Sequence, residues 1–272
     1  HPITSADFMV DDITNKGSLT FTFQATAASG YEFLRWVIED VENNTYLYSY
    51  ENSNTGFQHT FTSSSNVYAE FIPEGSALFC LLGNESKIYL KLSEAIKAAV
   101  NTSSNKVVVL ERSGVLYQET ETVDYFDVST NKYTIPSDVT LLIPNSENSA
   151  DYKVHMGTLT AEQIYTIPSG QSQPFNQVKL LTIDNGQDID VDGKVCIYAT
   201  VVANTGAVCY YGRLHLGDGS NITLKSGAEL TALGYITGHD NSSVTAKSGS
   251  VVQEVMQIAD WRGGNALAQI AK

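Results

Sequence analysis

The sequence is short of cysteine, of basic residues and of long apolar runs, and each shortage argues against a class of protein. Three cysteines in 272 residues cannot form the disulfide framework of a small secreted domain, so stability must come from packing. The 16 Lys and Arg against 30 Asp and Glu leave a net charge of −14 and no basic patch, which argues against nucleic acid and anionic membranes as partners. No apolar run approaches the ~20 residues needed for insertion across a bilayer.

The remaining composition indicates a folded, β-rich chain. Hydrophobic residues make up 42% of it, too many for a disordered protein, and Ser, Thr and Asn supply most of the polarity. We expect Cys80, Cys196 and Cys209 to be buried as small apolar side chains, with a Cys196–Cys209 bridge as the alternative. Because the first residue is His1 rather than Met, we expect the chain to be a processed or excised fragment.

The segment from His1 to Glu74 shows short stretches of alternating apolar and polar side chains separated by turns, the pattern of β-strands. We expect strands at 18–25, 31–37, 46–48, 59–62 and 67–71. In the second of these, Tyr31, Phe33 and the stem of Arg35 are predicted to share one face. The segment 73–76 contains Pro and Gly and is predicted to be a linker, which places a domain boundary near Glu74.

A family resemblance lies in this first segment. Residues 30–36 read Gly-Tyr-x-Phe-x-x-Trp, and a closing strand at 67–71 ends in Ala-x-Phe. This pattern resembles the internalin-type B-repeat of bacterial surface proteins, in which aromatic rings supply the core of a very small module. The resemblance covers about 70 residues. It implies a cell-surface spacer or adhesion module rather than a catalyst, although the family often occurs in tandem and this copy is single.

The second segment, 77–272, opens differently. Residues 92–100 have the spacing of an amphipathic helix that Ser93 can cap and Asn101 can end. A fully apolar stretch at 107–110 follows directly and is too short for a helix, so we expect a buried strand. A short helix followed by such a strand resembles the N-terminal cap of right-handed parallel β-helices, the pectin-lyase-like fold.

Internal repeats support a solenoid. The sequence of Tyr133–Ser137 is repeated identically at Tyr165–Ser169. Residues 222–227 match 244–249 at an offset of 22, and 186–195 match 227–236 at an offset of 41. Three short strands with turns need roughly 20–25 residues per coil, so these offsets predict one coil and nearly two. The predicted fold is therefore all-β: a small β module at 1–74, then a right-handed β-helix at 77–272 with a short capping helix and glycines at its corners.

The densest acidic run lies at 184–193. Asp188, Asp190 and Asp192 followed by Gly193 match the start of a calcium-binding loop, which makes calcium the candidate cofactor of this chain. The twelfth position of such a loop is Ala199 instead of the required Glu, and no flanking helices are predicted. The alternative is a strand that turns apolar side chains inward and acids to solvent.

The same carboxylates are the main candidates for catalysis. Enzymes of the pectin-lyase-like fold use several Asp residues on one face, or calcium with an Arg or Lys base, and glycosidases need two spaced carboxylates. The characteristic motifs of these enzymes are not recognisable here. The five histidines are scattered, and no metal-binding or triad motif contains them.

Aromatic residues are the candidates for ligand binding. Tyr198, Tyr210, Tyr211 and Trp261, with Tyr235 nearby, could stack on sugar rings. Packing at the edge of the solenoid would use the same residues. The sequence thus favours an extracellular or surface-displayed bacterial protein that binds a glycan or another cell-surface ligand without catalysis. A polysaccharide lyase or glycosidase is the alternative, and a purely structural spacer is a third hypothesis.

Overall fold

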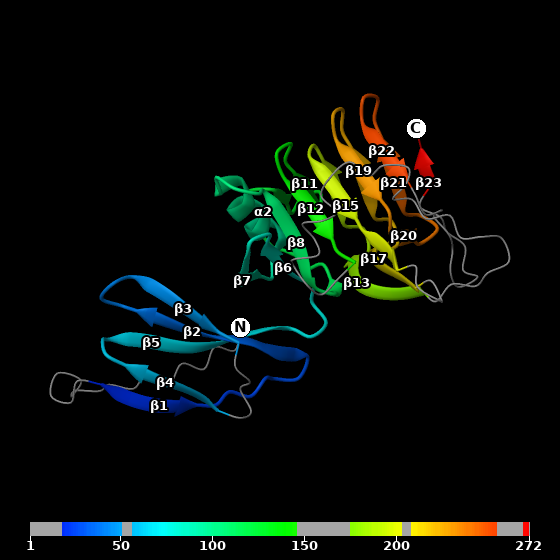
Figure 1. The fold of residues 1–272 in the computed structure, drawn as a ribbon. Coiled ribbons are helices and arrows are strands. Elements are labelled where there is room, and N and C mark those ends of the chain that lie inside the picture. The colour runs from blue at the N-terminus through cyan, green and yellow to red at the C-terminus, as the bar shows by residue number, and fades with distance from the viewer. Residues whose placement is uncertain (1–17, 51–55, 146–174, 203–207, 255–268, 272) are drawn as a thin grey trace. The chain divides into compact units, whose positions relative to one another are not determined.

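The computed structural model describes residues 18–50, 56–145, 175–202, 208–254 and 269–271 (Figure 1). The chain forms two compact units, His1–Glu74 and Gly75–Lys272. The second copy of the repeat, Tyr165–Ser169, and the candidate ligand residue Trp261 lie outside the described residues. No helix within the described ranges is long and apolar enough to cross a membrane.

The N-terminal unit contains two antiparallel sheets. One pairs β1 (Leu19–Phe23) with β4 (Phe57–Phe61), and the other has the order β3 (Thr45–Ser49), β2 (Tyr31–Asp40), β5 (Ser65–Pro73). Their aromatic core is built around Trp36, which stacks on Phe57 with 5.6 Å between ring centroids. The strands predicted from the alternating pattern are therefore present, and large rings fill a core with few aliphatic residues.

The prediction for Arg35 is wrong. A register shift between Phe33 and Arg35 interrupts the alternation of β2, so that Phe33 packs on the aromatic core and Arg35 does not. Arg35 instead contacts Glu70 at 2.5 Å, and its guanidinium lies 4.3 Å from the centroid of the Tyr48 ring. A β-bulge changes the face that later side chains take, and local alternation does not reveal where one occurs.

The second unit is built from three sheets, which we call faces A, B and C. Face A contains β10 (Phe126–Asp127), β11 (Lys132–Ile135), β14 (Asp188–Val191), β18 (Asn221–Leu224), β21 (Ser243–Ala246) and β23 (Gln269–Ala271). Face B contains β22 (Val251–Glu254), β19 (Glu229–Ala232), β15 (Lys194–Ile197), β12 (Thr140–Ile143), β8 (Val107–Arg112), β6 (Leu78–Leu81) and β7 (Asn84–Tyr89). Face C contains β16 (Ala199–Val202), β17 (Val208–Leu216), β13 (Phe175–Ile183) and β9 (Gly114–Val115), with β20 (Tyr235–Gly238) beside β17.

The chain visits the three faces in turn, which makes this unit a parallel β-helix. Strand β11 of face A is followed by β12 of face B and β13 of face C, and the next coil begins with β14 on face A. Strands of successive coils pair in parallel, as β11 does with β14 and β12 with β15 (Figure 1). Parallel crossovers are right-handed in nearly all proteins, which is the winding that the sequence predicts.

Stacked aliphatic side chains form the core of the β-helix. Every second residue of a strand points inward, and equivalent positions of successive coils lie above one another. The inward rows are nearly inaccessible to solvent: Ile189, Ile222 and Val244 on face A, Leu141, Val195 and Leu230 on face B, and Leu181, Leu214 and Ile236 on face C. Burial of these rows supplies the main favourable free energy of the fold.

The register confirms one repeat offset and corrects the other. Ile222 pairs with Val244, as the shorter offset predicts. Residues 186–195 and 227–236 are not equivalent, because β14 lies on face A whereas its supposed counterpart β19 lies on face B. Ile189 pairs instead with Ile222, in a longer coil that contains the β16–β17 hairpin. Every strand follows a turn and then alternates apolar with polar residues. Similar sequences therefore recur on different faces of one coil as well as on the same face of successive coils.

The predicted helix is α2 (Leu92–Asn101). Its residues Ala95, Ile96 and Ala99 are buried against the core beside Phe79, so the helix covers the N-terminal end of the β-helix (Figure 1). Ser93 does not cap it, because the N-cap position is Lys91. The buried Ser93 hydroxyl donates to Glu119 Oε2 at 2.8 Å instead.

The cysteines whose side chains are described are free thiols. Cys80 is buried, and burial raises its pKa above the ordinary range, as expected of a small apolar side chain. Cys196 is partly buried on face B, and burial raises its pKa to about 11. Because Cys196 is free, the alternative of a bridge between Cys196 and Cys209 is wrong.

Candidate ligand-binding faces of the β-helix

Face A carries the acidic run that the sequence singles out. Strand β14 alternates as predicted, with Ile189 and Val191 buried in the core and Asp188 and Asp190 facing away from it. Each of these aspartates lies beside polar residues of the neighbouring coils, because parallel pairing aligns β14 with β11 on one side and β18 on the other.

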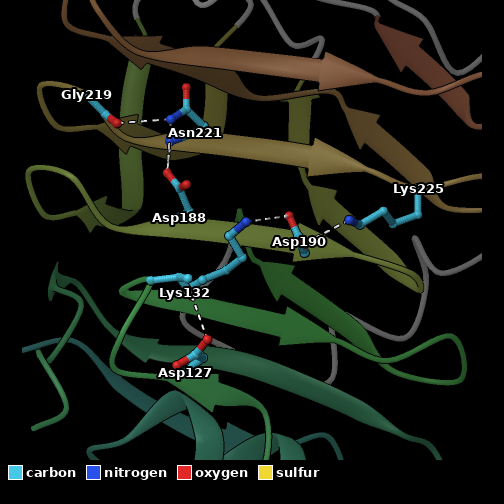
Figure 2. A network of polar contacts seen from close by, with 8 residues as sticks. Asp127, Lys132, Asp188, Asp190, Gly219, Asn221 and Lys225 are labelled. Atoms are coloured by element: carbon cyan, nitrogen blue, oxygen red, sulfur yellow. Dashed lines mark hydrogen bonds and ion pairs between the residues drawn. The ribbon is translucent and has the colours of Figure 1, made fainter. Parts of the chain in front are cut away.

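Figure 2 shows how these two carboxylates are satisfied. The Asp188 Oδ1 atom accepts hydrogen bonds from the backbone nitrogen of Asn221 at 2.9 Å and from its Nδ2 at 3.0 Å. Asp190 lies 2.8 Å from the Nζ of Lys225 and 3.7 Å from the Nζ of Lys132. The hydrogen bond to Asp190 raises the pKa of Lys225. Neighbouring coils thus supply nitrogen groups that compensate both carboxylates.

The arrangement gives no support to a calcium site at Asp188, Asp190 and Asp192. In the part of the chain that the structure describes, no three His, Cys, Asp or Glu side chains are grouped so that they could hold a metal ion. Alternate residues of a flat strand lie ~7 Å apart, and the partners found here are nitrogen donors rather than further oxygen ligands. Face A fits the alternative interpretation, a strand with its acids turned outward.

The tyrosines of the predicted ligand set differ widely in exposure. Tyr198 and Tyr211 are only 3% and 6% exposed, which leaves little ring surface for a ligand. Burial raises the pKa of Tyr198. Tyr211 packs edge-on against Tyr235 with 4.7 Å between ring centroids. Tyr210, on the other side of β17, is 39% exposed. Edge packing therefore describes Tyr198 and Tyr211, whereas Tyr210 is accessible to a ligand.

Face C brings together four polar residues that the sequence did not connect. Arg213 and His215 lie on β17, Thr237 lies on β20, and His239 follows directly in the chain. The Thr237 hydroxyl oxygen accepts a hydrogen bond from Arg213 Nε at 2.9 Å and lies 2.9 Å from His215 Nδ1. The His215 and His239 rings meet edge-on with 5.4 Å between centroids. We call these four residues the basic cluster.

The basic cluster sits beside aromatic side chains. Parallel pairing of β17 with β20 places Tyr235 next to Arg213 and Thr237 next to His215. On the opposite edge of β17, Leu180 and Thr182 of β13 are the paired residues, and neither carries a charge. Arg213 and His215 are half-buried and His239 is exposed, so the cluster can reach solvent from the outer side of the sheet.

The environment of His215 disfavours its charged form. Burial is the largest cause that lowers its pKa, and the positive charge of Arg213 and the neighbouring His239 lower it further. Burial acts by disfavouring any charged form, and only the two smaller causes are charges of neighbouring side chains.

One signal in the sequence could have located the cluster. The confirmed offset of 22 places position 237 directly beside position 215. His239 then lies two positions further along the same edge. Scanning for histidine motifs along the chain misses this pair, because its members meet only after one full coil.

The N-terminal unit carries a second exposed aromatic surface on its three-stranded sheet. Tyr46 is 49% exposed and donates a hydrogen bond to Glu39 at 3.1 Å. Arg35 lies over Tyr48 of the same sheet. This surface belongs to a different unit from face C, which makes Tyr46 a suitable control position in binding experiments.

In comparison with known proteins, the chain matches no protein-family model, no curated protein and no solved structure at a significant level.

Proposed function

We propose that the protein is a non-enzymatic adhesion protein of a bacterial cell surface that binds glycans through face C of its β-helix. The observation that carries the proposal is the position of Tyr235 beside Arg213, with Thr237 and His215 on the next pair of outward positions. An aromatic ring can stack on the apolar face of a sugar while neighbouring donors bind its hydroxyl groups. The exposed Tyr210 lies on the other side of β17 and is not part of this surface.

The N-terminal unit supports the proposed location of the protein. Its antiparallel sheets and the core around Trp36 suit a B-repeat-like module, and the resemblance to the internalin-type B-repeat supports display on a bacterial surface. A β-helix attached to such a module would present its long flat faces outside the cell. The polar, sparsely charged composition also suits an extracellular scaffold.

No specific observation favours the alternative of a polysaccharide lyase or glycosidase. Hydrolysis requires carboxylates that can exchange protons with the substrate or attack it. Asp188 is hydrogen-bonded to Asn221, and Asp190 is held between two lysines. Lys179 is buried and donates to the backbone carbonyl of Glu111. Asp188, Asp190 and Lys179 are thus already engaged in contacts within the protein.

Binding of the intact chain to an immobilised panel of neutral, carboxylated and sulfated glycans tests the proposal. We expect binding to at least one class, and we expect Tyr235→Ala to weaken it at least tenfold. Tyr46→Ala removes an exposed ring from the other unit and should leave binding unchanged.

Two outcomes would contradict the proposal. One is the absence of binding to every glycan of the panel by a chain that is folded by circular dichroism. The other is an equal loss of binding in Tyr46→Ala and Tyr235→Ala, which would place the ligand elsewhere or show that any exposed ring suffices.

A further inference from the structure

Strand β3 (Thr45–Ser49) is the terminal strand of the three-stranded sheet in the N-terminal unit (Figure 1). Its neighbour in this sheet is β2, with which it pairs antiparallel over all five residues. The outer side of a terminal strand is the place where a further strand can be added, because backbone donors and acceptors point away from the sheet there. This edge is therefore a candidate interaction surface.

The side chains of β3 lack the features that usually protect a sheet edge. Natural edge strands carry charged residues or proline, or they contain a bulge. No residue of β3 is charged or a proline, and its pairing with β2 shows no register shift. The strand at the opposite edge, β5, contains Glu70 and Pro73 and pairs with β2 across a bulge. The two edges of this sheet thus differ in protection.

Apolar surface is exposed on both faces of β3. On the side of the aromatic core, Leu47 lies opposite Ile38, but Leu47 is 53% exposed whereas Ile38 is only 4% exposed. On the other side, Tyr46 is 49% exposed, and Tyr48 is partly exposed. Removing such surface from water favours association. A strand added beside β3 would cover Leu47 and Tyr46 at once.

The central residues of β3 are the same in both directions, because they form the palindrome Tyr46-Leu47-Tyr48. If two copies pair antiparallel about a twofold axis at Leu47, the two Leu47 side chains lie opposite each other. Each Tyr46 then lies opposite a Tyr48 on the same face of the sheet, and aromatic cross-strand pairs are favourable. Because β3 is uncharged, the pairing opposes no like charges within the strand, although the chain has a net charge of −14.

We infer that β3 is a self-association edge, to which a second copy of this chain adds its own β3 in antiparallel orientation. The two three-stranded sheets then form one sheet of six strands, and the same patch of both copies makes the contact, as a twofold dimer requires. Five-residue strands bury much less than the ~1,600 Å² of a stable complex, so the dimer is weak and depends on concentration. The inference is independent of glycan binding by face C.

Sedimentation equilibrium of the intact chain tests the inference. From micromolar to millimolar concentration, the weight-average mass should rise from that of one chain toward that of two. Leu47→Lys places two ammonium groups opposite each other on the twofold axis and should weaken dimerisation at least tenfold. Val41 lies in the turn after β2 and is also 53% exposed, so Val41→Lys is the matched control and should dimerise as the wild type does.

Disulfide trapping gives a second measurement, which does not require Leu47→Lys to fold. Directly opposed residues of antiparallel strands have Cβ atoms ~4.5–5.5 Å apart, close to the separation that a disulfide spans. Leu47→Cys should therefore form an intermolecular disulfide on mild oxidation, and the equally exposed Val41→Cys should not. The wild type measures the background from its own thiols, of which Cys80 is buried and Cys196 partly buried.

Three outcomes would overturn the inference. One is a wild-type chain that stays monomeric up to millimolar concentration. The others are a dimer that Leu47→Lys does not weaken and equal trapping at positions 41 and 47, because either would place the contact away from β3.

The proposed function fails or succeeds separately. At concentrations well below the dissociation constant of the dimer, Leu47→Lys should bind glycans as the wild type does. Absence of glycan binding by a chain that dimerises through β3 would overturn the proposed function and retain the self-association edge. Glycan binding by a chain that stays monomeric would do the reverse.

Discussion

At the level of single residues, the outward side chains of the β-helix acquire their chemistry from the coils beside them. Asp190 is compensated by Lys225 of the next coil, and His215 is oriented by Thr237 in the same way. Residues of one type therefore differ in role according to position. Tyr198 is an interior side chain, whereas Tyr210 is accessible.

Protonation of His215 should contribute to a loss of stability in acid. Its pKa is lower in the folded than in the unfolded chain, so the unfolded state binds more protons below the ordinary histidine pKa of ~6.5. The penalty is absent above that pH and grows as the pH falls toward the lowered value. We expect the Tm of His215→Gln to fall less between pH 7.5 and 5 than the Tm of the wild type. His59→Gln in the N-terminal unit serves as the control, and an equal fall in wild type and His215→Gln would contradict the prediction.

At the level of strands and turns, the corners of the coils depend on glycine for two different reasons. Gly227 has a φ of +87°, and a Cβ atom there would meet nothing within 4 Å. Gly193 has no positive φ, but its Cβ would lie 2.3 Å from the carbonyl oxygens of Pro136 and Val139. The first glycine is required by the backbone conformation and the second by close approach of two coils.

These two reasons predict different costs of substitution. Gly227→Ala should lower the free energy of unfolding by ~1 kcal/mol, the cost of a left-handed conformation for an L-residue. Gly193→Ala should lower it by ~3 kcal/mol, because two backbone segments must move apart. Urea denaturation measures both values. Gly227→Asn, which tolerates positive φ, should be milder than Gly227→Ala, and equal losses at positions 193 and 227 would contradict the assignment.

The strands and the helix were largely predictable, whereas the site was not. Alternation located the strands of both units, and the spacing of apolar residues located α2, because both signals are local. Local patterns did not reveal the bulge that turns Arg35, nor the role of Ser93 as a partner of the buried Glu119. The basic cluster was missed because its residues lie on different coils.

In the molecule as a whole, the boundary between the units is set by hydrogen bonds of the β-helix. The Gly75 carbonyl accepts from the backbone nitrogen of Val115 at 3.0 Å. The next carbonyl, of Ser76, accepts from Arg112 Nη2 at 2.8 Å. Residues 75 and 76 thus belong to the β-helix by their contacts, although their composition suggested a linker.

Two truncated chains should therefore differ in stability. A chain beginning at Gly75 is expected to keep the β-sheet circular dichroism and the cooperative unfolding of the β-helix. A chain beginning at Leu78 loses the hydrogen bonds of Gly75 and Ser76, the hydrogen bond from the Ala77 nitrogen to the Val115 carbonyl at 2.8 Å and the buried Ala77 side chain. It should be less stable by ~1–3 kcal/mol in urea denaturation. Equal stability of the two truncations would show that these contacts contribute nothing.

Periodicity along the chain was enough to specify the β-rich composition, most strands, the capping helix and the shorter coil repeat that pairs Ile222 with Val244. The strand and helix signals lie in neighbouring residues, and the coil repeat lies in the recurrence of similar residues along the chain, so the linear sequence contains all of them. The folded structure, by contrast, determines which side chains of neighbouring coils are in contact. Coil length changes wherever a hairpin is inserted, so the register between coils, and with it the meeting of His215, Thr237 and Arg213, depends on the packed fold rather than on local pattern.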